Sequence, residues 1–146
     1  MKYYDCIFIG SGSANIILEE ALKLGLKCAQ IEKDKFGGTC LNRGCIPTKV
    51  LTTAADALLE VNRMKKIGIQ AELKGFDWGL ISSRVKHQIN QNIELRKFYK
   101  QTKNLDVYEG MARFVNDKVV EVHMNDSNRS VQVTADKIYI GAGGRT

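Results

Sequence analysis

The turn Gly10-Ser11-Gly12-Ser13-Ala14-Asn15 decides the fold of this chain. It follows a short apolar run at residues 4–9 and precedes apolar residues at helical spacing over 16–24. Gly25 ends that helix, and a second apolar run at 27–31 leads to Glu32. A strand, glycine turn, helix and strand within about 30 residues predict two parallel neighbours in one sheet, because the crossover between such strands is right-handed.

The glycines of this turn are typical of a phosphate-binding loop. Gly10 permits the tight turn, and Gly12 lets a pyrophosphate approach the backbone. The helix that follows presents its first N–H groups to the phosphates. Glu32 follows Gly12 by 20 residues, where a carboxylate accepts hydrogen bonds from ribose hydroxyls. The alternative for this unit alone is an ordinary strand-to-helix turn.

Asn15 stands where the dinucleotide fingerprint has its third glycine. That glycine normally allows the helix to pack closely on the strand. Asn15 therefore predicts either a wider approach or a side chain turned to bond a nearby backbone group.

Two helices are predicted in the middle of the chain, at residues 50–64 and from residue 77 to about 103. The buried side of the first is predicted to hold Leu51, Ala54, Ala55, Leu58, Leu59 and Val61. The apolar stripe of the second is Trp78, Ile81, Val85, Ile89, Ile93 and Phe98. We interpret the basic residues off that stripe as a solvated face: Arg84, Lys86, Arg96, Lys97 and Lys100.

After residue 104 the hydrophobic period changes to two, which predicts short strands. They are expected at residues 107–110, 112–115, 118–124, 130–134 and 137–140, with a hairpin joining the third to the fourth. The predicted fold class is α/β: a Rossmann-like domain with a parallel sheet, an added long helix and a small antiparallel β-layer.

Composition narrows the class of protein. The 146 residues are 44% hydrophobic and 26% charged, which fits a globular core. No apolar run reaches the length of about 18 residues that spans a membrane, and the N-terminal run ends in glycines rather than at a cleavage site. The net charge of +6 is spread along the chain without a nucleic-acid-binding motif. We expect a cytoplasmic protein with no membrane or nucleic-acid partner.

The four cysteines fall into two kinds of environment. Cys6 and Cys28 lie in predicted buried strands, where cysteine behaves as a small hydrophobic residue. Cys40 and Cys45 lie together in a glycine-rich stretch, which in a cytosolic chain indicates redox or metal chemistry. His87 and His123 stand alone, so no set of zinc ligands is complete and no metal is expected.

The spacing of Cys40 and Cys45 requires an interrupted helix if the two form a disulfide. A regular helix would hold their Cα atoms about 8.7 Å apart, whereas a disulfide spans at most about 7 Å. Gly44 and Pro47 supply the means of distortion. Lys49 shares a helix face with Cys45 if the helix resumes there. A static disulfide and two reduced core thiols remain as alternatives.

The stretch Gly38-Thr39-Cys40-Leu41-Asn42-Arg43-Gly44-Cys45-Ile46-Pro47-Thr48-Lys49 resembles the redox-active motif of the class I pyridine nucleotide-disulfide oxidoreductases. This group includes dihydrolipoamide dehydrogenases and the glutathione, mycothione and mercuric reductases. The resemblance extends over the whole chain and includes Glu32, Gly110-Met111-Ala112 and the closing segment 134–144.

The resemblance implies that FAD is the cofactor. The implied FAD-contacting positions are Gly10, Gly12, Ser13, Ala14, Glu32, Lys33, Gly38, Thr39, Cys40, Lys49, Ala112 and Gly143. It also implies three catalytic residues. Cys45 faces the flavin, Cys40 is the interchange thiol, and Lys49 lies near the ring nitrogen that receives hydride.

The implied reaction moves electrons between NAD(P)(H), FAD, the Cys40–Cys45 pair and a dithiol or disulfide substrate. The substrate would be a lipoyl group or a low-molecular-weight thiol, and the enzyme a homodimer. Within the group we favour a dihydrolipoamide dehydrogenase. Asn15 and the segment Phe76-Asp77-Trp78 look more like a mycothione reductase, and a mercuric reductase-like enzyme is also compatible. A non-catalytic redox module and an NAD-binding domain with incidental cysteines are the alternatives from other classes.

We expect residues 1–146 to be the N-terminal portion of the FAD-binding domain. The nicotinamide-binding and dimer-interface domains of the resembled family have no counterpart in these residues. The chain by itself is therefore expected to retain FAD weakly and to lack turnover.

Overall fold

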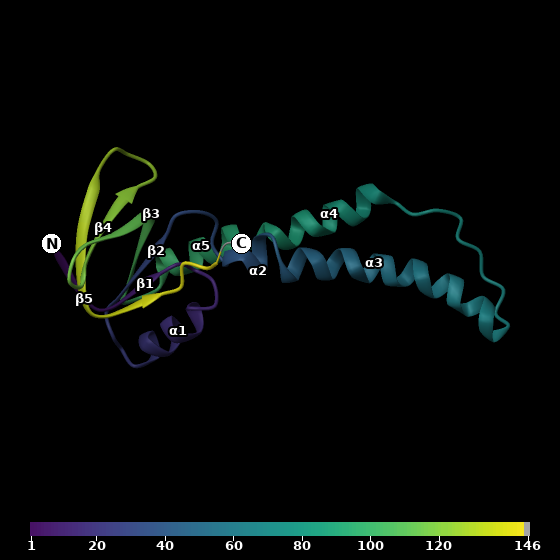
Figure 1. Ribbon diagram of the computed structural model, residues 1–146, viewed down its shortest axis with the longest axis horizontal. Coiled ribbons are helices and arrows are strands. Elements are labelled where there is room, and N and C mark those ends of the chain that lie inside the picture. Colours follow the sequence, from purple (N-terminus) through teal and green to yellow (C-terminus); the bar gives the residue numbers. More distant parts are fainter. Residues whose placement is uncertain (145–146) are drawn as a thin grey trace. The chain divides into compact units, whose positions relative to one another are not determined.

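The computed structural model describes residues 1–144 and divides into two units (Figure 1). The first unit comprises Met1–Thr39 and the chain from Asn92 onward, and the second comprises Cys40–Gln91. No helix among the described residues is both long and apolar enough to cross a membrane.

A single mixed sheet of five strands forms the first unit. The strands are β1 (Lys2–Ile9), β2 (Cys28–Glu32), β3 (Leu105–Asn116), β4 (Val119–Met124) and β5 (Ser130–Ile140). β1 pairs in parallel with β2 and β5, and β2 pairs in parallel with β3, whereas β4 is antiparallel to both of its neighbours. The sheet closes on itself as a barrel. The α/β class and the parallel strand–helix–strand unit are confirmed.

The antiparallel layer is continuous with the parallel sheet, which corrects the predicted strand boundaries. The expected strands at 107–110 and 112–115 are one strand, β3, and those at 130–134 and 137–140 are one strand, β5. β3 pairs with β2 up to Glu109 and with β4 from Gly110 onward. A Cβ atom on Gly110 would lie 2.3 Å from the carbonyl oxygen of His123, so the change of partner requires glycine.

Two apolar clusters hold this unit together. The first is made by the strands and contains Tyr4, Ile7, Ala29, Ile31, Val120, Val122, Val133 and Ala135. The second is shared with helices α1 (Asn15–Lys23) and α5 (Gln91–Gln101) and contains Cys6, Phe8, Leu18, Ala21, Cys28, Phe36, Tyr99 and Leu105. Burial of this apolar surface is the main force that fixes the two helices on the sheet.

The predicted helix from 77 to 103 is wrong in its continuity. Two helices occupy this stretch, α4 (Trp78–Ile89) and α5, and Asn90 lies between them. The residues of α5 that are buried are Asn92 and Tyr99, whereas Ile93 and Phe98 of the predicted stripe are exposed. The sequence here contains Asn90 and Asn92, and asparagine side chains compete with the helical backbone for hydrogen bonds. Hydrophobic spacing alone does not detect a break at one residue.

The basic residues of the predicted solvated face are exposed, and two of them also pair with a carboxylate. Arg96 Nε donates to Glu109 Oε2 at 2.9 Å and its Nη2 donates to Oε1 at 2.8 Å. Lys100 pairs with the same carboxylate. Partial burial raises the pKa of Glu109, but the bonds from Arg96 and Lys100 outweigh it and lower the pKa below its ordinary value. The two cations therefore link α5 to β3 at the last residue that pairs with β2.

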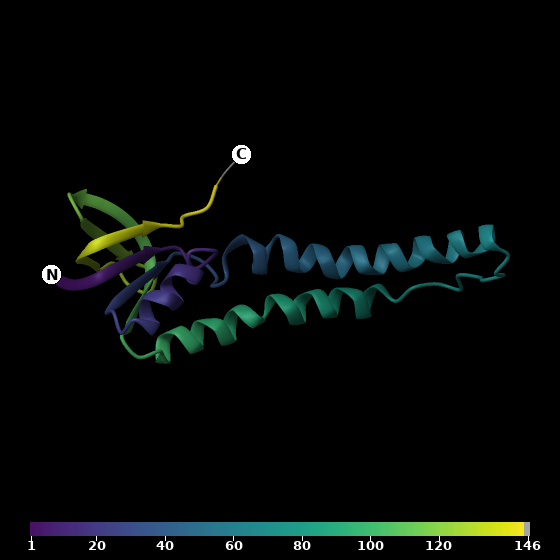
Figure 2. The ribbon, with the colours of Figure 1, turned by 90° about the horizontal axis from the view of Figure 1, so that it is seen from below.

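The second unit is helical. It contains α3 (Cys45–Met64), the short 3-10 helix η1 (Lys65–Ile67) and α4, and α2 (Gly38–Asn42) crosses from the first unit. α3 and α4 lie side by side (Figures 1 and 2). α3 begins five residues before the predicted helix and buries only Pro47, whereas Leu51 and Leu59 of the predicted buried side are exposed.

The glycine turn gives a test of how tightly the first unit closes. A Cβ atom on Gly10, where φ is +104°, would lie 2.2 Å from the carbonyl oxygen of Gly141. Gly25 also has a positive φ, +78°, but a Cβ atom there meets nothing within 4 Å. We expect Gly25→Ala to lower the free energy of unfolding by about 1 kcal/mol and Gly10→Ala by about 3 kcal/mol or more, measured by urea denaturation. Equal losses would show that the backbones at Gly10 and Gly141 separate freely.

Candidate nucleotide and redox sites

The predicted phosphate-binding turn lies where the parallel strands end. Gly10 N–H donates to the carbonyl of Ile31 at 2.7 Å, and Gly141 N–H donates to that of Ile9 at 2.8 Å. These two bonds bring the chain after β1 against the ends of β2 and β5. In open parallel sheets, ligands bind at this carboxyl edge of the strands.

The N-terminus of α1 fits a diphosphate. Ala14 is its N-cap residue and offers no side-chain acceptor, and the first turn holds no acidic residue. Among residues 1–144, no acceptor takes a hydrogen bond from the N–H groups of Gly12, Ser13 or Ala14. Free donors at the positive end of a helix dipole bind anions. The described residues therefore suit the pyrophosphate of a dinucleotide at this turn.

Glu32 is buried at the end of β2 and binds the turn directly. Its Oε2 accepts from the N–H of Ser11 at 2.9 Å and from the Ser11 hydroxyl at 2.7 Å. Its Oε1 accepts from the N–H of Asp34 at 2.9 Å. A carboxylate has about four lone-pair positions, so three of them are used and one on Oε1 remains for a ribose hydroxyl.

Ser11 is a residue that the sequence analysis did not single out. Its side chain is 1% exposed, and its hydroxyl accepts from the N–H of Gly37 at 3.1 Å while it donates to Glu32. Next to it, a Cβ atom on Gly38 would lie 2.7 Å from the Cα atom of Gly12. Glu32, Gly38 and the glycine turn therefore form one packed group. A serine inside a glycine turn gives no local signal of these contacts, which depend on segments 26 residues apart.

Asn15 replaces the third glycine by bonding the backbone, one of the two outcomes that the sequence predicts. Its Nδ2 donates to the carbonyl of Ser11 at 3.0 Å, and its Oδ1 accepts from Gln30 Nε2 at 2.6 Å. Gln30 is fully buried, and its Oε1 has no hydrogen-bond partner within residues 1–144. Asn15 thus ties the turn to β2.

The remaining predicted cofactor positions lie along the same unit. Lys33 is exposed directly after Glu32, and Thr39 is exposed in α2. Ala112 is half-buried in β3 opposite Val122 of β4, and Gly143 follows β5 in an exposed stretch with φ +79°. The part of Lys33, Thr39, Ala112 and Gly143 in cofactor binding stays a prediction.

The second unit carries the predicted redox pair in an interrupted helix. Cys40 lies in α2, Cys45 is the first residue of α3, and Gly44 separates the two helices with φ −124° and ψ −116°. The backbone break that a disulfide would need is therefore present. Both cysteines are exposed and reduced, which leaves them open to thiol exchange.

Cys40 and Cys45 interact through their sulfur atoms. The Cys45 sulfur is a hydrogen-bond partner of the Cys40 thiol and raises its pKa above the ordinary value. The N–H groups of Cys45 and Ile46, at the start of α3, also bond the Cys40 sulfur and act in the opposite direction, but more weakly. Lys49 lies one turn along α3 from Cys45, so the predicted shared face exists.

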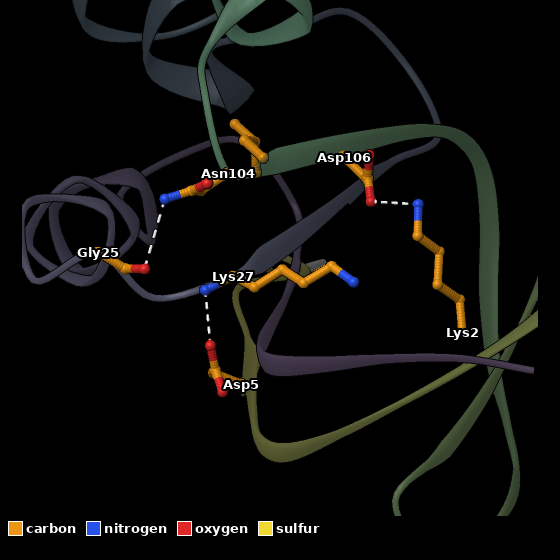
Figure 3. A pocket seen from close by; sticks show the side chains of 7 residues that line it. Lys2, Asp5, Gly25, Lys27, Asn104 and Asp106 are labelled. Carbon is orange, nitrogen blue, oxygen red and sulfur yellow. Dashed lines mark hydrogen bonds and ion pairs between the residues drawn. The ribbon is translucent and has the colours of Figure 1, made fainter.

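A shallow pocket lies at the opposite, amino edge of the parallel strands (Figure 3). It has a volume of about 340 Å³ and is lined by Lys2, Asp5, Gly25, Lys27, Asn104, Leu105 and Asp106. Lys2 pairs with Asp106 at 2.7 Å, and Lys27 lies over the ring of Tyr4. None of the predicted site residues lines it. No cluster of three or more metal-binding side chains occurs in residues 1–144.

Comparison with known proteins identifies the family. The family model of the pyridine nucleotide-disulphide oxidoreductases matches residues 4–146. The chain belongs to this family of flavoprotein disulfide reductases, as the cysteine motif predicts.

Individual relatives divide among several enzymes. The chain is 34% identical to a mycothione reductase of Mycobacterium tuberculosis over 99% of its length, and 34% identical to a glutathione reductase of Schizosaccharomyces pombe over 98%. It is 33% identical to a dihydrolipoyl dehydrogenase of Acholeplasma laidlawii over 82%. The chain spans 32%, 32% and 37% of these three proteins, about a third of their length.

A solved structure agrees with the fold. The chain resembles the Cu(II) complex of the HOCl-induced flavoprotein disulfide reductase RclA from Escherichia coli, with a TM-score of 0.78 and 29% sequence identity. The match covers all of this chain and 30% of the RclA chain.

The Asn15 bridge predicts that restoring the fingerprint glycine destabilises the chain. Asn15→Gly removes the bond to Ser11 and the shortest bond of the buried Gln30 amide, so we expect the free energy of unfolding in urea to fall by about 1–3 kcal/mol. In a Gln30→Leu background the loss of stability caused by Asn15→Gly should be smaller, because no buried amide is then left without its hydrogen-bond partner. A gain of stability in Asn15→Gly would contradict the bridge.

The raised pKa of Cys40 predicts how its alkylation depends on pH. In the reduced chain the thiolate fraction of Cys40 at neutral pH is depressed, because the Cys45 sulfur raises the Cys40 pKa. Cys45→Ala removes that cause, so the midpoint of iodoacetamide labelling at Cys40, followed by peptide mass spectrometry, should move to lower pH. Thr48→Ala, in the same turn of α3, is the matched control and should leave the midpoint in place. An unshifted midpoint in Cys45→Ala would refute the assignment.

Proposed function

We propose that this chain is the FAD-binding portion of an enzyme that moves electrons between NAD(P)(H), FAD, the Cys40–Cys45 pair and a dithiol or disulfide substrate. The observation that carries the proposal is the pair of exposed, interacting thiols across an interrupted helix, in a chain of the disulfide oxidoreductase family. FAD, when bound, would relay electrons between the nicotinamide and the cysteines.

The cofactor-binding roles follow from the geometry of the first unit. The free N–H groups of Gly12, Ser13 and Ala14 would hold the diphosphate, and the open lone pair of Glu32 would accept from the ribose. Ser11 keeps Glu32 and Gly37 in place for this contact. Lys33, Gly38, Thr39, Ala112 and Gly143 are proposed as further contacts from the resemblance.

The exchange roles follow from the second unit. The Cys40 thiolate would attack one sulfur of the substrate disulfide and release the other as a thiol. The Cys45 thiolate would then attack the mixed disulfide at Cys40, which forms the Cys40–Cys45 bond and releases the second substrate thiol. In sum, two protons and two electrons pass from the cysteines to the substrate. Lys49 would stabilise the negative charge of the Cys45 thiolate from the next turn.

For the substrate we propose a lipoyl group, which is the disulfide in the step above and the dithiol when the same exchange runs in reverse. A low-molecular-weight disulfide of the mycothione type is the second candidate. The second candidate is favoured by Asn15 and by the segment Phe76-Asp77-Trp78, where Asp77 caps α4 by accepting from the N–H of Leu80 at 2.9 Å. The proposal includes a homodimeric enzyme in the cytoplasm, where dithiols are kept reduced.

A substitution at the helix N-terminus tests the cofactor site with two readouts of opposite sign. Ala14→Asp places a carboxylate at the positive end of the α1 dipole and should raise the stability of the chain, by about 0.5 kcal/mol. The same carboxylate repels the diphosphate, so we expect FAD binding, measured by fluorescence anisotropy, to weaken by about tenfold or more. Ala14→Asn has the same size without the charge and is the matched control. Equal FAD affinity of the Asp and Asn variants would refute the diphosphate site.

A spectroscopic experiment separates the enzyme from a passive redox module. When the FAD-loaded chain is reduced with a dithiol, we expect long-wavelength charge-transfer absorbance that is lost in Cys45→Ser and kept in Cys28→Ser. Flavin-loaded protein without such a band would favour the passive module.

A further inference from the structure

Two of the four cysteines take no part in the proposed function, and the sheet sets them side by side. Cys6 of β1 and Cys28 of β2 are direct partners in the parallel ladder. Neighbouring strands lie about 4.8 Å apart, and the Cα atoms of a disulfide lie about 4.4–6.8 Å apart. The backbone spacing at this position therefore suits a covalent link without any change of register.

The two thiols lie next to each other in the core. Each cysteine is among the causes of the other's pKa shift, and the Cys28 thiol also approaches the carbonyl of Leu26 at 3.7 Å. Cys6 is 2% exposed and Cys28 is fully buried, both within the apolar cluster under α1 and α5. That cluster holds no other sulfur among the described residues, so each thiol has one possible partner within reach.

We propose that Cys6 and Cys28 are a second redox pair, which a two-electron thiol oxidant closes into a disulfide between β1 and β2. This inference rests on the strand register and not on the proposed function, so either can fail alone. The small hydrophobic role that the sequence assigns to the two residues would then describe only their reduced state.

Sequence neighbours of both cysteines line the pocket at the amino edge, which is the side from which we expect a small oxidant to reach the pair. Asp5 and Lys27 line this pocket, and each directly precedes one of the two cysteines (Figure 3). Leu105 also lines it and packs in the same cluster as the thiols. The hollow thus approaches the pair from the side where the strands begin, away from the glycine turn.

Burial sets the order in which the two pairs oxidise. Desolvation raises the pKa of Cys6, although Lys137 of β5, its partner on the other side of β1, acts in the opposite direction. Desolvation also raises the pKa of Cys28 to about 12. Cys6 is therefore the first thiol to react. The buried pair should form its disulfide on the order of a hundredfold more slowly than exposed thiols, because the thiolate fraction is small and the oxidant has little access to the sulfur atoms.

The step balances with a diazene oxidant such as diamide. The Cys6 sulfur adds to one nitrogen of the N=N bond and loses its proton. The Cys28 sulfur then attacks the Cys6 sulfur, the S–N bond breaks, and the S–S bond forms. Two protons and two electrons leave the thiols, and the diazene becomes a hydrazine.

The test uses the full chain with Cys40→Ser and Cys45→Ser, which leaves only the buried pair. After diamide treatment under native conditions, intact mass spectrometry should show the loss of two hydrogen atoms, and a peptide map should show the Cys6–Cys28 link. The rate should be on the order of a hundredfold below that of the exposed pair in the matched Cys6→Ser/Cys28→Ser chain. The oxidised chain should unfold at a higher urea concentration than the reduced one, because the link restrains the unfolded state.

Two results would overturn the proposal. One is that both thiols stay reduced in the native chain while the same chain oxidises in urea. The other is a disulfide that joins different molecules rather than Cys6 to Cys28. Adding Cys28→Ser to the test chain should abolish the internal link, and the wild-type chain should lose two hydrogen atoms quickly and two more slowly.

Discussion

Contact of backbone with backbone at the carboxyl edge of the sheet is the constraint on which the first unit depends. Gly10 meets the carbonyl of Gly141, and Gly12 meets Gly38, at distances that leave no room for a Cβ atom. These two approaches hold the turn after β1 against the segments that follow β5 and β2. They therefore set the position of the free N–H groups of α1. The buried carboxylate of Glu32 completes the arrangement by accepting from Ser11 and Asp34. An anion site made of backbone donors needs this rigidity, since no side chain is available to adjust it.

The same functional group acquires two chemistries in this chain because of its surroundings. Cys40 in α2 and Cys45 at the start of α3 are both exposed, which suits exchange with a substrate. Cys6 and Cys28 are ladder partners in an apolar cluster, where the ionised form is costly. A difference in desolvation, rather than in sequence spacing, separates the fast pair from the slow one.

The errors of the sequence analysis have a common origin in long-range packing. The stripe from Trp78 to Phe98 has a helical period, yet the helix is interrupted at Asn90. The second helix, α5, buries Asn92 and Tyr99. Arg96 and Lys100 are exposed as the pattern predicts, but the pattern does not indicate their partner Glu109, which lies on a strand whose position no local pattern reveals. The expected separate strands are continuous because one long strand can pair first with one neighbour and then with another. β3 changes its partner in this way at Gly110.

The sequence by itself determined the parallel strand–turn–helix–strand unit, the glycine turn at its centre and the broken helix between Cys40 and Cys45. These features depend on residues close together in the chain, where periodicity, glycine and helix geometry act directly. Only the tertiary structure decided three contacts: Ser11 hydrogen-bonds both Glu32 and Gly37, Asn15 accepts a hydrogen bond from Gln30, and Cys6 pairs with Cys28 in the strand ladder. Each of these contacts requires the register of two strands or the docking of separate segments, and register is a property of the assembled sheet that no single stretch of sequence contains.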